Sequence, residues 1–124
     1  MNRILVVDDN AASRELLRVV LKGPDREILE ACHGGQALEM IAGETPDLVL
    51  LDIEMPVMDG FGVLRRLRED PRFVTLPVVA VTAHAMQGAE ESALSAGFSG
   101  YITKPIRPAD VRRQVAALLR KETI

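Results

Sequence analysis

The segment Ile4-Leu5-Val6-Val7-Asp8-Asp9 joins four consecutive apolar residues to two carboxylates. An uninterrupted apolar run of this length predicts a strand that is buried on both faces, as in a parallel sheet. Three later runs also end on polar groups: residues 48–51 on Asp52, residues 78–81 on Thr82, and residues 101–103 on Lys104-Pro105. Because ligands of open parallel sheets bind beyond the carboxyl ends of the strands, we expect these side chains to meet at one edge.

Strand and helix patterns alternate five times along the chain, and residues 27–31 form the more mixed run expected of an edge strand. This alternation predicts an α/β fold, a flavodoxin-like, doubly wound parallel sheet of five strands in the order 2-1-3-4-5 with five helices. In that order the winding reverses between the first and third strands. The crevice at the reversal is therefore expected to be flanked by Asp8, Asp9 and Asp52.

The helix boundaries follow from caps and breakers. The first helix is expected to begin after Asn10 and to stop at Gly23-Pro24, with Gly23 in the left-handed conformation. The second is expected after Gly34-Gly35, the third from Asp59-Gly60 with Asp59 as a capping acid, and the fifth from Pro108. A fourth helix is expected over residues 86–96, where alanines, serines and a glycine bury little apolar area.

Size and composition set further limits. The 124 residues fit a single domain, residues 1–124, and the net charge of −3 argues against nucleic acid as a direct partner. We expect the arginines at positions 65, 66, 68 and 72 to lie on a solvated helix face. The lone Cys32 is expected to be a small buried residue, and its isolation favours a reducing cytoplasm. No signal peptide or membrane-spanning segment is predicted, so membrane insertion is not expected.

Three carboxylates in one crevice repel one another, and either shared protons or a divalent cation must relieve the repulsion. Oxygen-only ligands favour Mg²⁺, with Mn²⁺ as an alternative. A cation beside a lysine suits a phosphoryl group in transfer, and an aspartate can serve as the covalent nucleophile. Asp52 is the candidate because it ends the central strand, between the acids and the Thr82 and Lys104 side.

The ordered set Asp8-Asp9, Asp52, Thr82-Ala83 and Lys104-Pro105 resembles the receiver domain of two-component response regulators, over roughly residues 3–121. The resemblance implies that Asp52 accepts a phosphoryl group from a histidine kinase or a histidine phosphotransfer protein. It implies Mg²⁺ ligands from Asp8, Asp9, Asp52 and the main-chain carbonyl of Glu54. The protein would then be a cytoplasmic signalling switch rather than an enzyme.

The resemblance also implies roles in switching. Lys104 would pair with Asp52 and then with the phosphoryl oxygens, and the Lys104–Pro105 peptide would be cis. The Thr82 hydroxyl would swing toward the phosphate, and Tyr101 would rotate inward after it. The resemblance also implies that Glu54 and His84 would flank the route by which water attacks the phosphoryl group, so they would set its lifetime.

The sequence leaves other functions open. A pseudo-receiver that binds a partner without being phosphorylated is one alternative, although the site residues are intact. An aspartyl-nucleophile phosphohydrolase would place its nucleophile after the first strand, and a flavodoxin-type nucleotide binder would need a glycine-rich loop there. Because the sequence ends just after the fifth helix, we expect the output to be a contact with an unknown protein.

Overall fold

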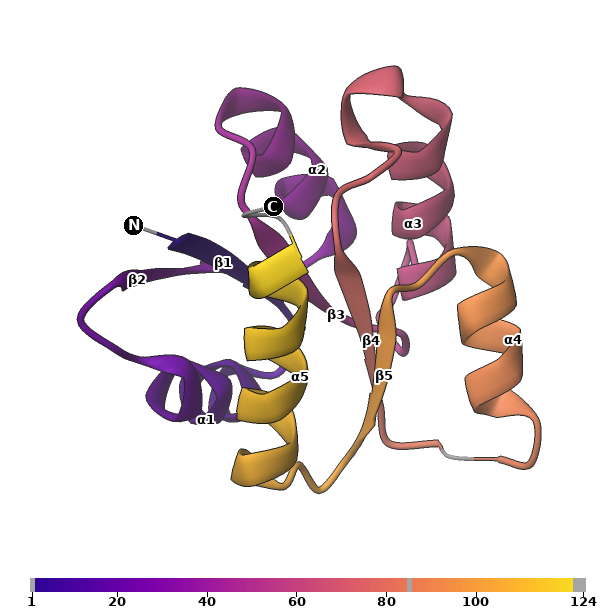
Figure 1. The fold of residues 1–124 in the computed structure, drawn as a ribbon. Helices are drawn as coiled ribbons and strands as arrows, with labels where there is room; N and C mark the ends of the chain where they lie inside the picture. The colour runs from indigo at the N-terminus through magenta and orange to yellow at the C-terminus, as the bar shows by residue number, and fades with distance from the viewer. Residues whose placement is uncertain (1, 85, 122–124) are drawn as a thin grey trace.

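The computed structural model describes residues 2–84 and 86–121, which form a central sheet with helices on both faces (Figure 1). The elements follow one another as β1 (Asn2–Val7), α1 (Ala11–Leu21), β2 (Arg26–Ala31), α2 (Gly34–Gly43), β3 (Leu48–Asp52), α3 (Gly60–Glu69), the short 3-10 helix η1 (Pro71–Phe73), β4 (Val78–Thr82), α4 (Ala89–Ala96), β5 (Gly100–Thr103) and α5 (Pro108–Lys121).

The sheet confirms the predicted topology. Its strand order is β2-β1-β3-β4-β5, and every neighbouring pair is parallel. Strands β3 and β4 are buried along their whole length because helices cover both faces of the sheet. One core layer packs α1 and α5 against the sheet, and the other packs α2, α3 and α4 against the opposite face (Figure 1).

Two of the predicted helix caps are present in the structure. The Asn10 side chain accepts a hydrogen bond from the Ser13 N–H at 3.0 Å, and the Asp59 side chain accepts one from the Gly62 N–H at 2.9 Å. Each side chain thereby satisfies a backbone donor that the first turn of its helix leaves unpaired. Asp59 is therefore a capping acid, as expected.

Other boundary predictions were wrong in part. The first helix ends at Leu21, before Gly23-Pro24 as expected, but Lys22 is its C-cap and Gly23 does not have a positive φ. The fourth helix begins at Ala89 rather than at residue 86, because Gly88 stands before it with φ +82° and breaks the helical conformation. The second helix already includes Gly34, since the His33 ring nitrogen caps it by accepting from the Gln36 N–H.

Two side-chain environments also differ from expectation. Cys32 is exposed rather than buried, because the strand β2 ends at Ala31 and the chain turns outward before α2. Arg68 is not on a solvated face: its guanidinium donates to the carbonyls of Phe73 and Leu76 at 2.8 Å and of Gly97 at 3.0 Å. The aliphatic stem of Arg68 lets its charged head group reach this half-buried position.

None of the helices in the described part of the chain has the length and apolar character that a membrane span requires.

Candidate functional site

The carboxyl ends of the parallel strands bring the predicted polar side chains to one edge of the sheet. Asp8 follows the last residue of β1, Asp52 ends β3 and Thr82 ends β4. In the register of β3 and β4, Asp52 lies opposite Val81, and the Ile53 N–H donates to the Val81 carbonyl at 3.0 Å. Lys104 follows β5, and its N–H donates to the Thr82 carbonyl at 2.8 Å. Pairing of the strands therefore determines the layout of the site.

An acidic cluster lies in the crevice between β1 and β3. One carboxylate oxygen from each of Asp8, Asp9 and Asp52 lies within 4.8 Å of the other two. Asp8 and Asp52 are only 1 % and 3 % exposed, whereas Asp9 faces solvent. This is an oxygen-only donor set with an open side, which fits a hard cation such as Mg²⁺ that keeps part of its water shell. The sequence prediction that these three acids meet is confirmed.

Main-chain groups orient the two buried carboxylates. The Asn10 N–H donates to Asp8 Oδ1 at 2.9 Å, and the Glu54 N–H donates to Asp52 Oδ1 at 3.1 Å. The Arg14 guanidinium donates to the main-chain carbonyl of Asp8 at 2.7 Å, which places a positive charge behind the crevice. These contacts pair buried acceptors that burial would otherwise leave unsatisfied.

The Lys104 ammonium bridges two of the acids. Its Nζ lies 2.9 Å from Asp8 Oδ2 and 3.7 Å from Asp52 Oδ2. The closer partner is Asp8, whereas the resemblance pointed to Asp52. Partial burial disfavours the ammonium, but the hydrogen bond to Asp8 and the negative charges of the nearby carboxylates together outweigh it and raise the pKa of Lys104. Lys104 therefore stays charged at the mouth of the crevice.

The surroundings of Asp52 change the pKa of its carboxyl group. Burial raises the pKa of Asp52 to about 6, and the neighbouring Asp8 carboxylate adds to the rise. The Lys104 ammonium and the Glu54 N–H act in the opposite direction. Added positive charge favours the ionised form of Asp52. The same position therefore suits both a bound cation and a carboxylate that accepts a phosphoryl group.

Glu54 and Thr82 are joined across the site by their side chains. The Thr82 hydroxyl donates to Glu54 Oε2 at 2.5 Å, and the Ala83 N–H donates to Glu54 Oε1 at 3.0 Å. His84 Nδ1 lies 3.4 Å from Glu54 Oε1. Burial opposes ionisation, but these hydrogen bonds outweigh it and hold the pKa of Glu54 below its usual value. The Thr82 hydroxyl thus points to Glu54.

Tyr101 lies on β5, one strand beyond Thr82, and its ring packs partly buried against the core. Its hydroxyl oxygen is buried and has no hydrogen-bond partner among the residues that the structure describes. Burial raises the pKa of Tyr101, and the carboxylates of Glu54 and Glu90 add to the effect.

The Lys104–Pro105 peptide, which directly follows β5, is cis, as the resemblance implied.

Two contributors to the site were not identified from the sequence. Gly60 lies directly behind Asp52, where a Cβ atom would come within 2.8 Å of the Asp52 carbonyl oxygen. The Ala83 N–H is a donor that side-chain reasoning alone does not reveal. Gly60 itself was a usable signal, since glycine is the usual residue where the backbone makes a close approach. No comparable signal marks a main-chain N–H.

Comparison with known proteins agrees with this geometry. The response regulator receiver domain family matches residues 4–116, which is most of the chain, so this chain belongs to that family. Its members are receiver domains of two-component response regulators, and such domains are signalling phosphoacceptors rather than enzymes in general. The family resemblance that the strand-end residues indicated is therefore confirmed.

Individual relatives differ in how much of their length this chain covers. The chain is 36 % identical over 103 residues to the polar-differentiation response regulator DivK of Brucella anthropi, a match that covers 83 % of this chain and 84 % of DivK. It is 42 % identical over 118 residues to the response regulator PleD of Caulobacter vibrioides, covering 95 % of this chain but only 26 % of PleD. A CheY-like response regulator receiver domain protein from Methanospirillum hungatei JF-1 superposes with a TM-score of 0.88 at 28 % identity, covering 99 % of this chain and 97 % of that one.

Proposed function

We propose that this chain is a phosphorylation-dependent switch in which Asp52 accepts a phosphoryl group from a phosphohistidine of a kinase or phosphotransfer protein. The observation that carries the proposal is the setting of Asp52. It is a buried carboxylate with two other acids within 4.8 Å and the Lys104 ammonium at 3.7 Å. This arrangement can hold one metal and one phosphoryl group together.

In the transfer step, a carboxylate oxygen of Asp52 forms a bond to phosphorus as the phosphorus–nitrogen bond to the donor histidine breaks. The electron pair of the broken bond returns to the imidazole nitrogen. Lys104 neutralises the phosphoryl oxygens, and the Thr82 hydroxyl and Ala83 N–H are donors at the same edge of the sheet. Such donors are most effective where the crevice excludes water.

Asp8, Asp9 and Asp52 would hold Mg²⁺, and Mn²⁺ would fit the same oxygen set. The main-chain carbonyl of Glu54 is a further proposed ligand, since the N–H of the same residue donates to Asp52 Oδ1 and so keeps its backbone beside the crevice. A bound cation supplies charge neutralisation between the acids and the incoming phosphoryl oxygens. Without it, the repulsion among the acids opposes the approach of an anionic donor.

A groove beside the crevice offers a place for the donor protein. It is lined by residues of α1 and of the loop before α5: Ser13, Leu16, Leu17, Lys104, Pro105 and Ile106. Leu16 is 49 % exposed, unusual for a large apolar side chain. Because Lys104 also contacts the acids, a helix seated in this groove would carry its phosphohistidine to Asp52. A cytoplasmic location, where such donors are found, would follow.

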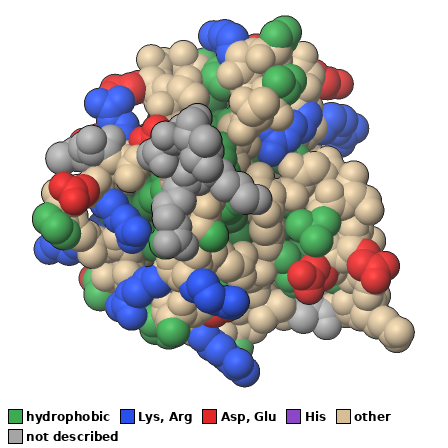
Figure 2. Space-filling view, viewed as in Figure 1, with side chains coloured by type: hydrophobic (Ala, Val, Ile, Leu, Met, Phe, Trp, Pro, Cys, Tyr) green, Lys and Arg blue, Asp and Glu red, His purple; other side chains and the backbone are tan. Residues whose placement is uncertain are grey.

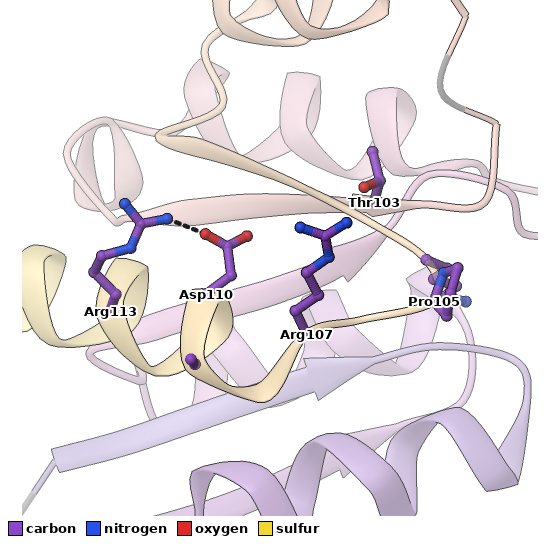
Figure 3. Close-up of a pocket in the computed structure, with 7 residues that line it drawn as sticks. Thr103, Pro105, Arg107, Asp110 and Arg113 are labelled. Atoms are coloured by element: carbon purple, nitrogen blue, oxygen red, sulfur yellow. Dashed lines mark hydrogen bonds and ion pairs between the residues drawn. The ribbon is translucent and has the colours of Figure 1, made fainter.

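The output surface is proposed on α4, β5 and α5. Only Ala93 of α4 is buried, so this helix has little apolar area to hold it in place. Figure 2 shows acidic side chains over α4 and basic ones over α5. Arg107 extends across the hollow between β5 and α5, beside the ion pair of Arg113 and Asp110 (Figure 3). A mixed surface of this kind suits a protein partner.

Incubation with acetyl phosphate and Mg²⁺, followed by intact-mass measurement, tests the function. Wild type should gain one phosphoryl group that hydroxylamine removes, and Asp52→Asn should gain none. Chelation of the metal should suppress the gain. No adduct on wild type would support a pseudo-receiver instead, and steady release of phosphate from a phosphomonoester would support a phosphohydrolase.

Hydrogen exchange with and without beryllofluoride, a phosphoryl mimic, tests the output surface. Exchange should change most in residues 86–96, at Tyr101 and along α5. A response confined to α2 and α3 would show that the switch works through another part of the fold.

A further inference from the structure

We propose that the Glu54 carboxylate occupies the donors that a phosphoryl group on Asp52 would use, so that phosphorylation has to displace it. The inference rests on the proposed function of Asp52 and adds a positioning role for Glu54. It concerns which anion the Thr82 hydroxyl and the Ala83 N–H bind before phosphorylation.

Both carboxylate oxygens of Glu54 are engaged. Oε2 accepts from the Thr82 hydroxyl at 2.5 Å, and Oε1 accepts from the Ala83 N–H at 3.0 Å. The direction of the first bond is set by a third contact, since the His84 N–H donates to Thr82 Oγ1 at 3.0 Å. Because Thr82 Oγ1 already accepts this hydrogen bond, the Thr82 hydroxyl can donate its own hydrogen to Glu54. Glu54 therefore binds the two donors as a two-oxygen acceptor.

The same donors lie where a phosphoryl group would need them. Asp52 and Val81 are directly opposed in the β3–β4 register, so Thr82 and Ala83 continue the chain just beyond the level of Asp52. The Glu54 N–H already donates to Asp52 Oδ1, which ties residue 54 to the acceptor. The other oxygen of the acceptor, Asp52 Oδ2, lies 3.7 Å from the Lys104 ammonium. Glu54 thus occupies the Thr82 and Ala83 side of the acceptor.

Two anions cannot share this set of donors. The Glu54 carboxylate accepts from both donors as an anion, the ordinary form of a glutamate side chain at neutral pH. A phosphoryl group on Asp52 would carry nearly two negative charges in place of the single charge of the carboxylate, so the negative charge beside Glu54 would increase. The Glu54 side chain is 35 % exposed, so it has a route to solvent once the donors are withdrawn. Charge repulsion and competition for the two donors therefore both favour displacement of the Glu54 side chain.

Variants at position 54 separate competition from simple charge repulsion. Glu54→Ala removes both the charge and the acceptor. Glu54→Asp keeps the charge but is one methylene shorter, so it loses its reach to Thr82 and Ala83. If the contact matters, both variants gain phosphate faster than wild type, by roughly tenfold, since each lost charge-assisted hydrogen bond no longer has to be broken. If only charge matters, Glu54→Asp behaves as wild type.

The experiment follows the phosphorylation rate of wild type, Glu54→Ala and Glu54→Asp by intact mass, with acetyl phosphate and saturating Mg²⁺. Glu39→Ala is the matched control, because it removes an exposed carboxylate from α2, away from the site. Hydrogen exchange of the Ala83 amide in metal-free protein gives a second readout. Its protection should fall in both position-54 variants and stay unchanged in Glu39→Ala.

The outcomes are separable. Faster phosphorylation of both position-54 variants, with loss of Ala83 protection, supports the inference. Wild-type rates in Glu54→Asp, or unchanged Ala83 exchange in Glu54→Ala, overturn it while the proposed function stands. If wild type and every variant fail to gain a phosphoryl group, the proposed function itself fails, and the competition proposed for Glu54 fails with it.

Discussion

The backbone of Gly60 lies against the carbonyl oxygen of Asp52 so closely that a Cβ atom at position 60 would come within 2.8 Å of it. The Cα atom of Ile53 would lie at the same distance, and the Gly60 N–H donates to the Ile53 carbonyl at 2.9 Å. The start of α3 is thus packed directly behind the proposed phosphoacceptor. Only a glycine permits this approach without moving the backbone of Asp52.

Gly60→Ala should therefore destabilise the protein by about 1–3 kcal/mol, the usual range for overpacking, and slow phosphorylation by shifting Asp52. Urea denaturation and the acetyl phosphate assay measure the two effects. Gly43→Ala is the control, because no atom lies within 4 Å of a Cβ at position 43 and alanine favours the helix α2. Equal stability of the two variants would show that the backbone behind Asp52 accommodates a methyl group.

Asp52→Asn should stabilise the metal-free protein in a pH-dependent way. Burial and Asp8 raise the pKa of Asp52 to about 6, so between about pH 4 and 6 the folded state keeps a proton that the unfolded chain has released. Wild type therefore loses stability as pH rises through this window, and the asparagine variant does not.

Denaturation in chelating buffer at acidic and neutral pH measures this difference. The advantage of Asp52→Asn over wild type should be small near pH 4 and on the order of 1–3 kcal/mol near pH 7.5. Asp25→Asn, at an exposed position, controls for the chemical change itself. A pH-independent advantage would mean that Asp52 is not perturbed in the way its surroundings indicate.

Val57→Gly should stabilise the loop after β3. Val57 has φ +69° and is fully exposed, so a β-branched side chain is held in a left-handed conformation with no packing in return. Glycine adopts this conformation freely, and the expected gain is about 1 kcal/mol. Val74→Gly is the control: Val74 is also exposed but has φ −64°, so glycine there should be destabilising. The test fails if both substitutions destabilise alike.

Most of the fold was predictable because its determinants are local in sequence. Apolar runs such as residues 48–51 are typical of strands buried on both faces, and right-handed crossovers leave few possible strand orders. The meeting of Asp8, Asp9 and Asp52 followed from the reversal of winding between β1 and β3. These predictions depend on topology and not on side-chain detail.

What the sequence did not reveal depends on tertiary contacts. Arginine is usually a surface residue, yet Arg68 is held by carbonyls outside its own helix, those of Phe73 and Leu76 shortly after it and that of Gly97 29 residues later. Glu54 could face solvent or the site, and only the positions of Thr82 and Ala83 decide its direction. Gly23 and Gly88 are both helix breakers in sequence, but only Gly88 has a positive φ.

Tyr101→Phe should leave stability unchanged or raise it by about 1 kcal/mol. The buried hydroxyl has no partner among the described residues, so it loses its hydration on folding without gaining a hydrogen bond. Phenylalanine removes that hydroxyl and keeps the ring against the core. Tyr101→Leu, which removes the ring, should destabilise in the same thermal denaturation series. A clear loss of stability in Tyr101→Phe would reveal a hydrogen bond in solution.

Arg68→Met should destabilise the protein by about 2 kcal/mol, because the guanidinium satisfies three main-chain carbonyls at once. Methionine keeps most of the apolar stem, so the loss reports on the head group. The carbonyls of Phe73 and Leu76 belong to the segment that includes η1, and that of Gly97 to the turn after α4, so hydrogen exchange should rise in both places. Arg65→Met, one turn earlier and exposed, should change stability by less than about 0.5 kcal/mol. Similar effects of the two substitutions would show that Arg68 acts as an ordinary surface charge.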